Sequence, residues 1–218
     1  MSKRSRSPTP RTVLFVGNSF TARNDLPGMI ARLAEARDHA FEYRLISAGG
    51  ASLRRHWNAG EALRAIQDGK YSHVVLQEQS TLPVKNAKRM HESIRLFDEA
   101  IRAAGARTVL YMTWARQHQP EAQQVIADAY TSIGNELGAI VVPVGLAWMK
   151  FLETHDQPEL HDRDQSHPTP AGTYLAACVF LATLFGENPT GENDTLADLD
   201  QKSRADLQST AWRAAKQL

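Results

Sequence analysis

Five short apolar segments alternate with segments of helical periodicity along this chain, and this order constrains the fold more than any other feature. The apolar segments span residues 12–16, 41–46, 73–77, 108–113 and 139–142. Between them, apolar residues recur three and four positions apart, as Ile94, Phe97, Ile101 and Ala104 do. Strands that alternate with helices form βαβ units and a parallel sheet. The sequence therefore predicts an α/β fold, a three-layer α/β/α sandwich with about five parallel strands.

One domain accounts for most of the chain. Residues 12–218 contain neither an internal repeat nor a linker, and a chain of 218 residues is long enough for one sizeable core. Further helices are expected at about 169–185 and 196–216. Residues 1–11 are rich in Lys and Arg and lack an apolar stretch, so we expect a disordered basic tail there.

The composition excludes several classes of protein. A net charge of +1 argues against a nucleic-acid-binding surface, and the absence of an 18-residue apolar run argues against a membrane span. The lone Cys178 lies in an apolar stretch and has no second cysteine to pair with. These features predict a cytoplasmic protein that binds neither nucleic acid nor membranes, and they leave its oligomeric state open.

Polar and glycine-rich segments follow four of the predicted strands. They span residues 17–19, 47–50, 77–80 and 114–116. Because crossovers in parallel sheets share one hand, the carboxyl ends of the strands meet at one rim, where open α/β sheets bind their ligands. We therefore expect these four loops to lie together around a functional site.

A serine, a histidine and an aspartate among these segments could form a catalytic triad. Ser19 follows the first strand, and a serine nucleophile needs a base that a third group orients. His167 is the best-placed base, in a loop just before a predicted helix, and Asp164 lies three residues before it. The alternative for Asp164 and His167 is an ordinary polar turn with a helix cap at Thr169.

Taken together, the segments GNSF, the Gly-Gly pair, LQEQS and DQSHPT resemble the SGNH (GDSL-like) hydrolase superfamily, over residues 12 to about 186. Within this superfamily, the longer segments GNSFTARNDLP, GGASL, VVLQEQS and HPTPAGTYLAA resemble a bacterial subgroup. The resemblance implies that Ser19 is the nucleophile, His167 the general base and Asp164 the residue that orients it. No cofactor is implied, and the substrate would be a small ester.

The resemblance also implies an oxyanion hole made by the Ser19 N–H, a glycine N–H and an asparagine side chain. Gly50 matches the glycine, with Gly49 beside it as the alternative. The third segment departs from the family, because Gln79 stands where the asparagine is expected. Gln79 also carries an amide donor, and a shifted alignment would choose Gln77 or Ser80.

Two tryptophans and a glutamine are candidate substrate contacts. Trp57 follows the Gly-Gly loop, Trp114 follows the fourth strand, and Gln77 ends the third. Either tryptophan could instead pack into the core. Short loops with aromatic walls favour a short acyl group, such as acetyl, on a carbohydrate. A lysophospholipid-like substrate, or acyl transfer to an acceptor other than water, is the alternative chemistry.

Two other functions compete with a serine esterase. One is a metal site built from the cluster His155, His161, Asp162, Asp164 and His167, although the spacing matches no metal-binding motif and our prediction is that no metal is bound. The other is a binding module that kept the fold without its chemistry. The complete set of Ser, His and Asp favours the esterase.

Overall fold

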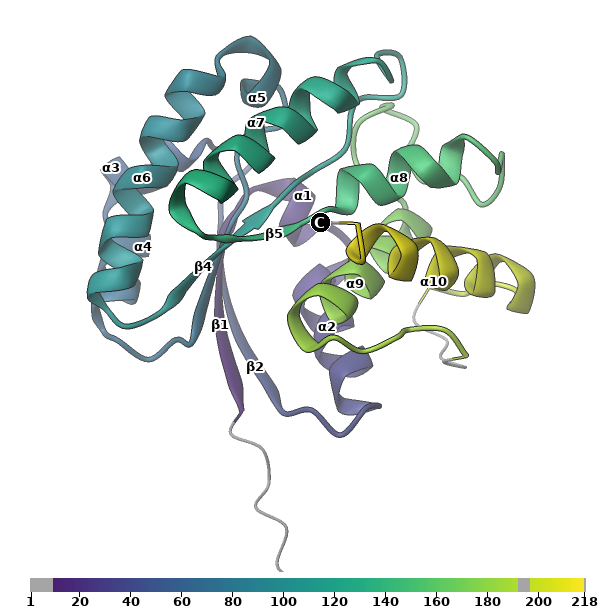
Figure 1. Cartoon of the computed structure of the whole chain (residues 1–218), viewed down its shortest axis with the longest axis horizontal. Helices are drawn as coiled ribbons and strands as arrows, with labels where there is room; N and C mark the ends of the chain where they lie inside the picture. The colour runs from purple at the N-terminus through teal and green to yellow at the C-terminus, as the bar shows by residue number, and fades with distance from the viewer. Residues whose placement is uncertain (1–9, 192–196, 218) are drawn as a thin grey trace, which may run out of the picture.

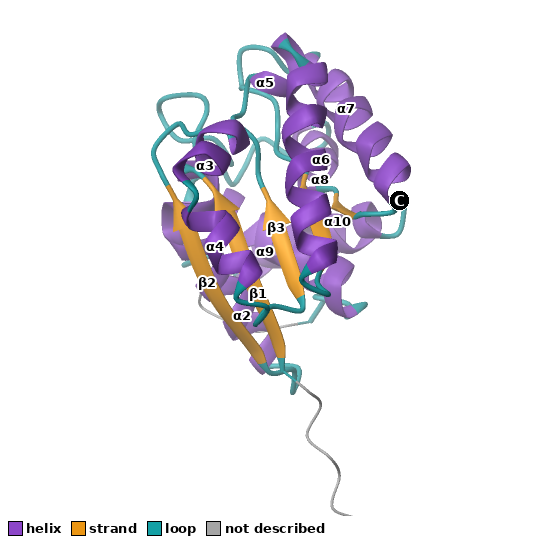
Figure 2. Ribbon diagram, turned by 90° about the vertical axis from the view of Figure 1, so that its left-hand side faces the viewer, coloured by secondary structure: helices purple, strands orange, loops and turns teal. Residues whose placement is uncertain are grey.

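A parallel β-sheet runs through the middle of the molecule, with helices on both faces (Figures 1 and 2). The computed structural model describes residues 10–191 and 197–217, so the predicted basic tail lies almost wholly outside the described residues. Within them the strands are β1 (Arg11–Gly17), β2 (Phe41–Ser47), β3 (His73–Leu76), β4 (Arg107–Tyr111) and β5 (Ile140–Val142). Their order is β2-β1-β3-β4-β5, with every pair parallel, which is the flavodoxin-like order. The predicted fold class is confirmed.

Two groups of helices cover the two faces of the sheet. One face is packed against α2 (Leu26–Glu35), α8 (Val144–Leu152) and α9 (Pro170–Phe185). The other face is packed against α3 (Leu53–Ala59), α4 (Glu61–Gln67), α6 (Ala87–Ala103) and α7 (Ala122–Leu137). The outer helix α10 (Gln201–Ala215) packs on α8 and α9 (Figure 1).

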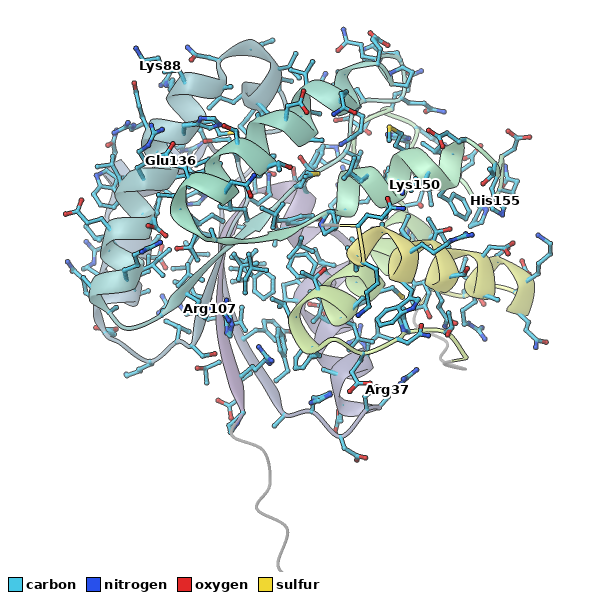
Figure 3. The ribbon with its side chains drawn as sticks, in the orientation of Figure 1. Arg37, Lys88, Arg107, Glu136, Lys150 and His155 are labelled. Atoms are coloured by element: carbon cyan, nitrogen blue, oxygen red, sulfur yellow. The ribbon has the colours of Figure 1, made fainter. Side chains whose placement is uncertain are left out.

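The two cores follow from the alternation of side chains along the strands. Val13 and Phe15 of β1 point into the core under α9, whereas Leu14 and Val16 point into the core under α6. Helix α9, which carries the buried Cys178, is apolar nearly all round because α2, α8 and α10 surround it. Charged side chains such as Lys88, Arg107 and Glu136 lie at the outside of the molecule (Figure 3).

Local details differ from the sequence prediction at several helices. Helix α10 begins at Gln201 rather than at 196, because the Asp200 side chain caps it by accepting from the Ser203 N–H at 2.9 Å. Three short helices are not predicted: α1 (Ser19–Ala22), α3 and α5 (Leu82–Lys85). Among the described residues, none of the helices has the length and apolarity needed to cross a membrane.

Candidate active site

Ser19 lies where β1 passes directly into a helix, rather than in the turn that the sequence predicts. Asn18 is the N-cap of α1, and its Oδ1 accepts from the Phe20 N–H at 3.0 Å. The Asn18 amide nitrogen donates to the Ala51 carbonyl at 3.0 Å, which ties this turn to the loop after β2. Ser19 therefore occupies the first helical position, where the backbone N–H has no acceptor within the helix.

Gln77, at the end of β3, holds the turn that carries Ser19 through hydrogen bonds to residues on either side of it. Its Oε1 accepts from the Asn18 N–H at 2.9 Å and from the Thr21 hydroxyl at 3.0 Å. A Cβ added to Gly17 would come within 2.7 Å of that oxygen, so only glycine allows this approach. Gln77 is 0% exposed. Gln77 thus supports the turn and does not contact the substrate, so this prediction is wrong. A polar residue at the end of a strand suggested an exposed side chain, but this strand end is buried.

His56 is a second support that the sequence analysis does not identify. It lies on α3, and its Nε2–H donates to the Gly17 carbonyl at 2.7 Å. Burial lowers the pKa of His56, although the bond to the Gly17 carbonyl acts in the opposite direction, and the neutral imidazole still donates from Nε2. No local pattern marks this residue, because its partner lies 39 positions away.

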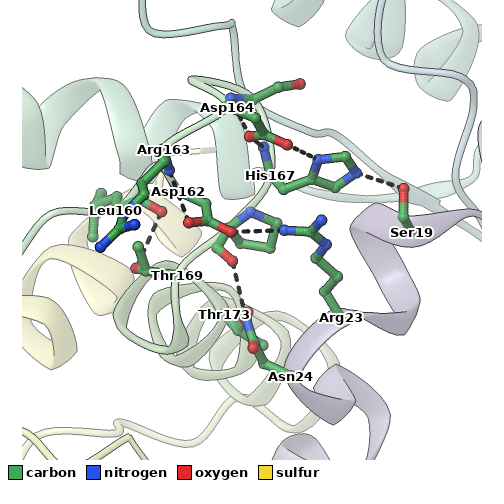
Figure 4. A network of polar contacts seen from close by, with 12 residues as sticks. Ser19, Arg23, Asn24, Leu160, Asp162, Arg163, Asp164, His167, Thr169 and Thr173 are labelled. Atoms are coloured by element: carbon green, nitrogen blue, oxygen red, sulfur yellow. Dashed lines mark hydrogen bonds and ion pairs between the residues drawn. The ribbon is translucent and has the colours of Figure 1, made fainter.

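The structure brings Ser19, His167 and Asp164 together (Figure 4). The Ser19 Oγ lies 2.7 Å from His167 Nε2, and His167 Nδ1 bonds to Asp164 Oδ2. Asp164 Oδ1 also accepts from the backbone N–H groups of Ser166, at 3.0 Å, and His167, at 2.8 Å. Desolvation opposes ionisation, but these hydrogen bonds outweigh it and lower the pKa of Asp164 to about 2. The carboxylate can therefore hold the proton of His167 on Nδ1 and leave Nε2 free to accept from the serine.

Two residues, Arg23 and Asn24, hold the segment after Ser19 against the loop that carries His167 and against the first turns of α9 (Figure 4). Arg23 pairs with Asp162 at 2.8 Å. The Asn24 amide nitrogen donates to the Pro168 carbonyl at 3.0 Å and to the Thr173 hydroxyl at 2.9 Å. Asn24 adopts a positive φ of 53°, which asparagine tolerates better than most residues. These contacts span about two thirds of the chain and fix the distance between the serine and the histidine.

The loops that carry the predicted oxyanion donors meet at the same rim. Ala48 to Ala51 form a β-turn closed by a 3.0 Å bond, with Gly50 at a φ of +60° that favours glycine. The Gln79 Oε1 accepts from the Thr81 N–H at 3.0 Å and hydroxyl at 2.9 Å. Among the contacts of the described residues, none engages the Gln79 Nε2, so this donor is available to a ligand.

No protein-family model matches the sequence, and no curated protein matches it significantly. Solved structures do match. A candidate SGNH hydrolase from Slackia heliotrinireducens superposes with a TM-score of 0.68 at 28% identity, over 81% of this chain and 100% of that one. This chain has the SGNH hydrolase fold.

Other structures with this fold are more distant in sequence. A DUF4886 family protein from Bacteroides uniformis superposes with a TM-score of 0.78 at 21% identity, over 94% of this chain and 95% of that one. An acetyl xylan esterase superposes with a TM-score of 0.61 at 12% identity, over 78% of this chain and 98% of that one. The superfamily resemblance that the sequence motifs indicate is confirmed.

Within this SGNH hydrolase fold, both tryptophans follow the alternative that they pack against the core rather than line the site, although Trp57 is only half-buried. Trp114 is 2% exposed and stacks between Phe20, at 4.9 Å between ring centroids, and Trp148, at 3.9 Å. Trp57 packs edge-on against Phe97 of α6 at 5.2 Å. Both are packing residues, because large aromatic rings at these loop bases bury more apolar surface in the core than at the rim. Trp114 still affects the site indirectly, since Phe20 contacts the His167 ring edge-on.

The cluster behind the competing metal site is dispersed by the fold. His161 Nε2 donates to the Ala115 carbonyl at 3.0 Å, and burial lowers the pKa of this histidine. His155 stacks on Phe151, and Asp162 pairs with Arg23. In the part of the chain that the structure describes, no three His, Cys, Asp or Glu side chains are grouped to hold a metal ion.

A buried carboxyl joins two loops of the site. Glu78 is 0% exposed, and its Oε1 accepts from the backbone N–H groups of Leu53, at 3.0 Å, and Gln79, at 2.6 Å. Its Oε2 has no partner among the described residues. Desolvation raises the pKa of Glu78 from about 4.5 to about 7, although both N–H groups act in the opposite direction.

This raised pKa makes the stability of the protein depend on pH. Between about pH 4.5 and 7 the folded state holds a proton on Glu78 that the unfolded state has lost, so stability falls as the pH rises. Above about pH 7 Glu78 is ionised in both states, and its burial lowers the free energy of unfolding by on the order of 3 kcal/mol. We expect Glu78→Gln to raise the Tm by several degrees at pH 8 and by much less at pH 5. Thermal denaturation at both values tests this, with Glu92→Gln on the exposed side of α6 as the control. The same pH dependence in both variants would contradict it.

Proposed function

We propose that the protein is a serine esterase that cleaves short acyl esters through Ser19, His167 and Asp164. The observation that supports it most is the line of hydrogen bonds from the Ser19 hydroxyl to His167 and on to the ionised Asp164. A serine hydroxyl becomes a nucleophile when such a neighbouring base takes its proton. The structural neighbours with this fold that are described as esterases give further support.

The proposed reaction proceeds in two halves. Ser19 Oγ attacks the ester carbonyl carbon while its proton passes to His167 Nε2, and the imidazolium formed is stabilised by Asp164. The alcohol then leaves with that proton, and the acyl group stays on Ser19. Water attacks the acyl carbon while its proton passes to Nε2. The bond between the acyl carbon and Ser19 Oγ then breaks, the proton returns from Nε2 to Oγ, and the acid is released.

The negative charge on the tetrahedral oxygen needs preorganised donors. We assign them to the backbone N–H groups of Ser19 and Gly50 and to the side-chain amide of Gln79. The Ser19 N–H lies at the N-terminus of α1, where it has no acceptor within the helix. The Gln79 amide is oriented by Thr81, whose N–H and hydroxyl donate to the amide oxygen. Gly50 lies in the turn beside the end of β1, where Ala48 N–H bonds to the Gly17 carbonyl at 3.3 Å.

The proposed substrate is a small acyl ester, such as an acetyl group on a carbohydrate. Its support is that the described loops after β1, β2 and β3 are short and offer no cover for a long acyl chain. One of the structural neighbours is described as an acetyl xylan esterase. Trp114 is buried and the half-buried Trp57 packs on Phe97, so the aromatic walls are removed from this argument.

A series of p-nitrophenyl esters tests the acyl preference. We expect kcat/KM to be highest for acetyl and to fall by about 10-fold at octanoyl, because methylenes left in water at the rim gain no burial while ordering the chain costs entropy. The measurement is the initial rate of p-nitrophenol release with acetyl, butyryl and octanoyl esters at matched concentrations. A preference for octanoyl would overturn the short-chain assignment and favour a lysophospholipid-like substrate.

A further inference from the structure

A cavity lined by basic side chains borders the proposed site. It has a volume of about 220 Å³ and lies between α5 and the loop that joins β4 to α7. Its polar lining comprises Ser80, Thr81, Lys85, Arg116, His118 and Gln119. No acidic residue of the described chain lines it. We refer to this as the basic cavity.

The loop that carries Arg116 is fixed to the loop of the catalytic base. The Trp114 indole N–H donates to the Ser166 carbonyl at 3.0 Å, and the Gln117 N–H donates to the Gln165 carbonyl at 3.0 Å. Arg116 thus lies between two residues, Trp114 and Gln117, that are hydrogen-bonded to the segment just before His167. On the opposite side, Ser80 directly follows Gln79. The basic cavity therefore borders the loop that is anchored beside His167 and the loop that carries Gln79.

The charge of the basic cavity is not neutralised within the protein. Among the described residues, Lys85, Arg116 and His118 form no ion pair. Arg116 is half-buried, and its Nε is a buried donor with no hydrogen-bond partner in the described part of the chain. A buried donor without a partner is costly, and a ligand acceptor removes that cost. The guanidinium fork matches a carboxylate in geometry and in charge.

We propose that the basic cavity binds a carboxylate carried by the alcohol part of the substrate, so that the protein prefers esters of acidic sugars or similar hydroxy acids. The inference rests on the proposed esterase function and narrows its substrate. The carboxylate is placed on the alcohol part because the acyl group is short. One half-buried guanidinium flanked by the exposed Lys85 and His118 suits a monoanion better than a phosphate dianion.

Two esters that differ only in charge test this proposal. They are a mono-O-acetylated methyl glucuronide, a methyl glycoside whose C6 carboxylate is free, and the corresponding methyl glucoside, with acetate release as the measurement. We expect the wild type to hydrolyse the glucuronide with a kcat/KM about 10- to 100-fold higher, chiefly through a lower KM. Arg116→Gln should abolish this preference while its activity on the glucoside stays within about 2-fold. Lys88→Gln on α6 removes one positive charge outside the basic cavity and should keep the preference.

A binding measurement separates this proposal from the proposed function. Calorimetry with methyl glucuronide, which carries a free carboxylate, and methyl glucoside uses the Ser19→Ala variant, with and without Arg116→Gln. The acidic sugar should bind more tightly only when Arg116 is present, whether or not either ester is cleaved. Equal binding of the two sugars, or an equal loss on both esters in Arg116→Gln, would overturn the carboxylate site and leave the esterase intact. Unchanged hydrolysis in Ser19→Ala would instead overturn the esterase.

Discussion

Ser19→Ala should lower kcat for p-nitrophenyl acetate by about 10³-fold or more. The reason is that the substitution removes the only atom that can form the acyl-enzyme in the proposed reaction, while the remaining donors give little rate by themselves. Ser19 is half-buried at the rim and its Oγ bonds to His167, so its loss removes little packing. We expect the Tm to change by less than about 2 °C.

Covalent labelling gives an independent measurement of the same residue. A fluorophosphonate should label the wild type on the peptide that contains Ser19, as found by mass spectrometry, and should not label Ser19→Ala. Asn18→Ala is unsuitable as a control because Asn18 holds the turn that carries Ser19, through its bonds to the Phe20 N–H and the Ala51 carbonyl. Ser52→Ala changes a serine on a neighbouring loop, where it caps α3, and should still be labelled. Wild-type turnover in Ser19→Ala would refute the proposed mechanism.

His167→Ala should lower kcat/KM by a similar factor, about 10³-fold or more, because among the described residues no other group lies at hydrogen-bonding distance to take the Ser19 proton. His161→Ala is the matched comparison, since His161 lies on the same loop and is buried against Trp148. Its Nε2 is committed to the Ala115 carbonyl. That variant should lose about 1–3 kcal/mol of stability and keep most of its activity.

This pair of variants also separates the esterase from a metal enzyme. Kinetics on p-nitrophenyl acetate should be unchanged by EDTA, and added zinc should not restore His167→Ala. Equal losses in His167→Ala and His161→Ala, both recovered by zinc, would favour the metal site built on the 155–167 segment.

Much of the fold and part of the candidate site follow from the sequence. The alternation of apolar strands with helical periodicity predicts the parallel sheet, and the uniform hand of its crossovers places the loops after β1 to β4 at one rim. The spacing of Asp164 and His167 is short enough for a direct hydrogen bond, so their pairing is predictable from local sequence. The contact between Ser19 and His167 depends on the topology, which brings together two residues that lie 148 positions apart.

The tertiary structure decided which of the polar and aromatic residues near the rim face the site. Gln77 and Gln79 are both amides at the end of β3, yet Gln77 is buried under the Ser19 turn and Gln79 keeps its amide nitrogen unengaged among the described contacts. Trp114 is equally ambiguous in the sequence, and only its stack with Phe20 and Trp148 shows that it is core. Burial depends on partners that are distant in sequence and on the space they leave. The local sequence contains no information about these partners, so only the packing of the folded chain determines which side chains are buried.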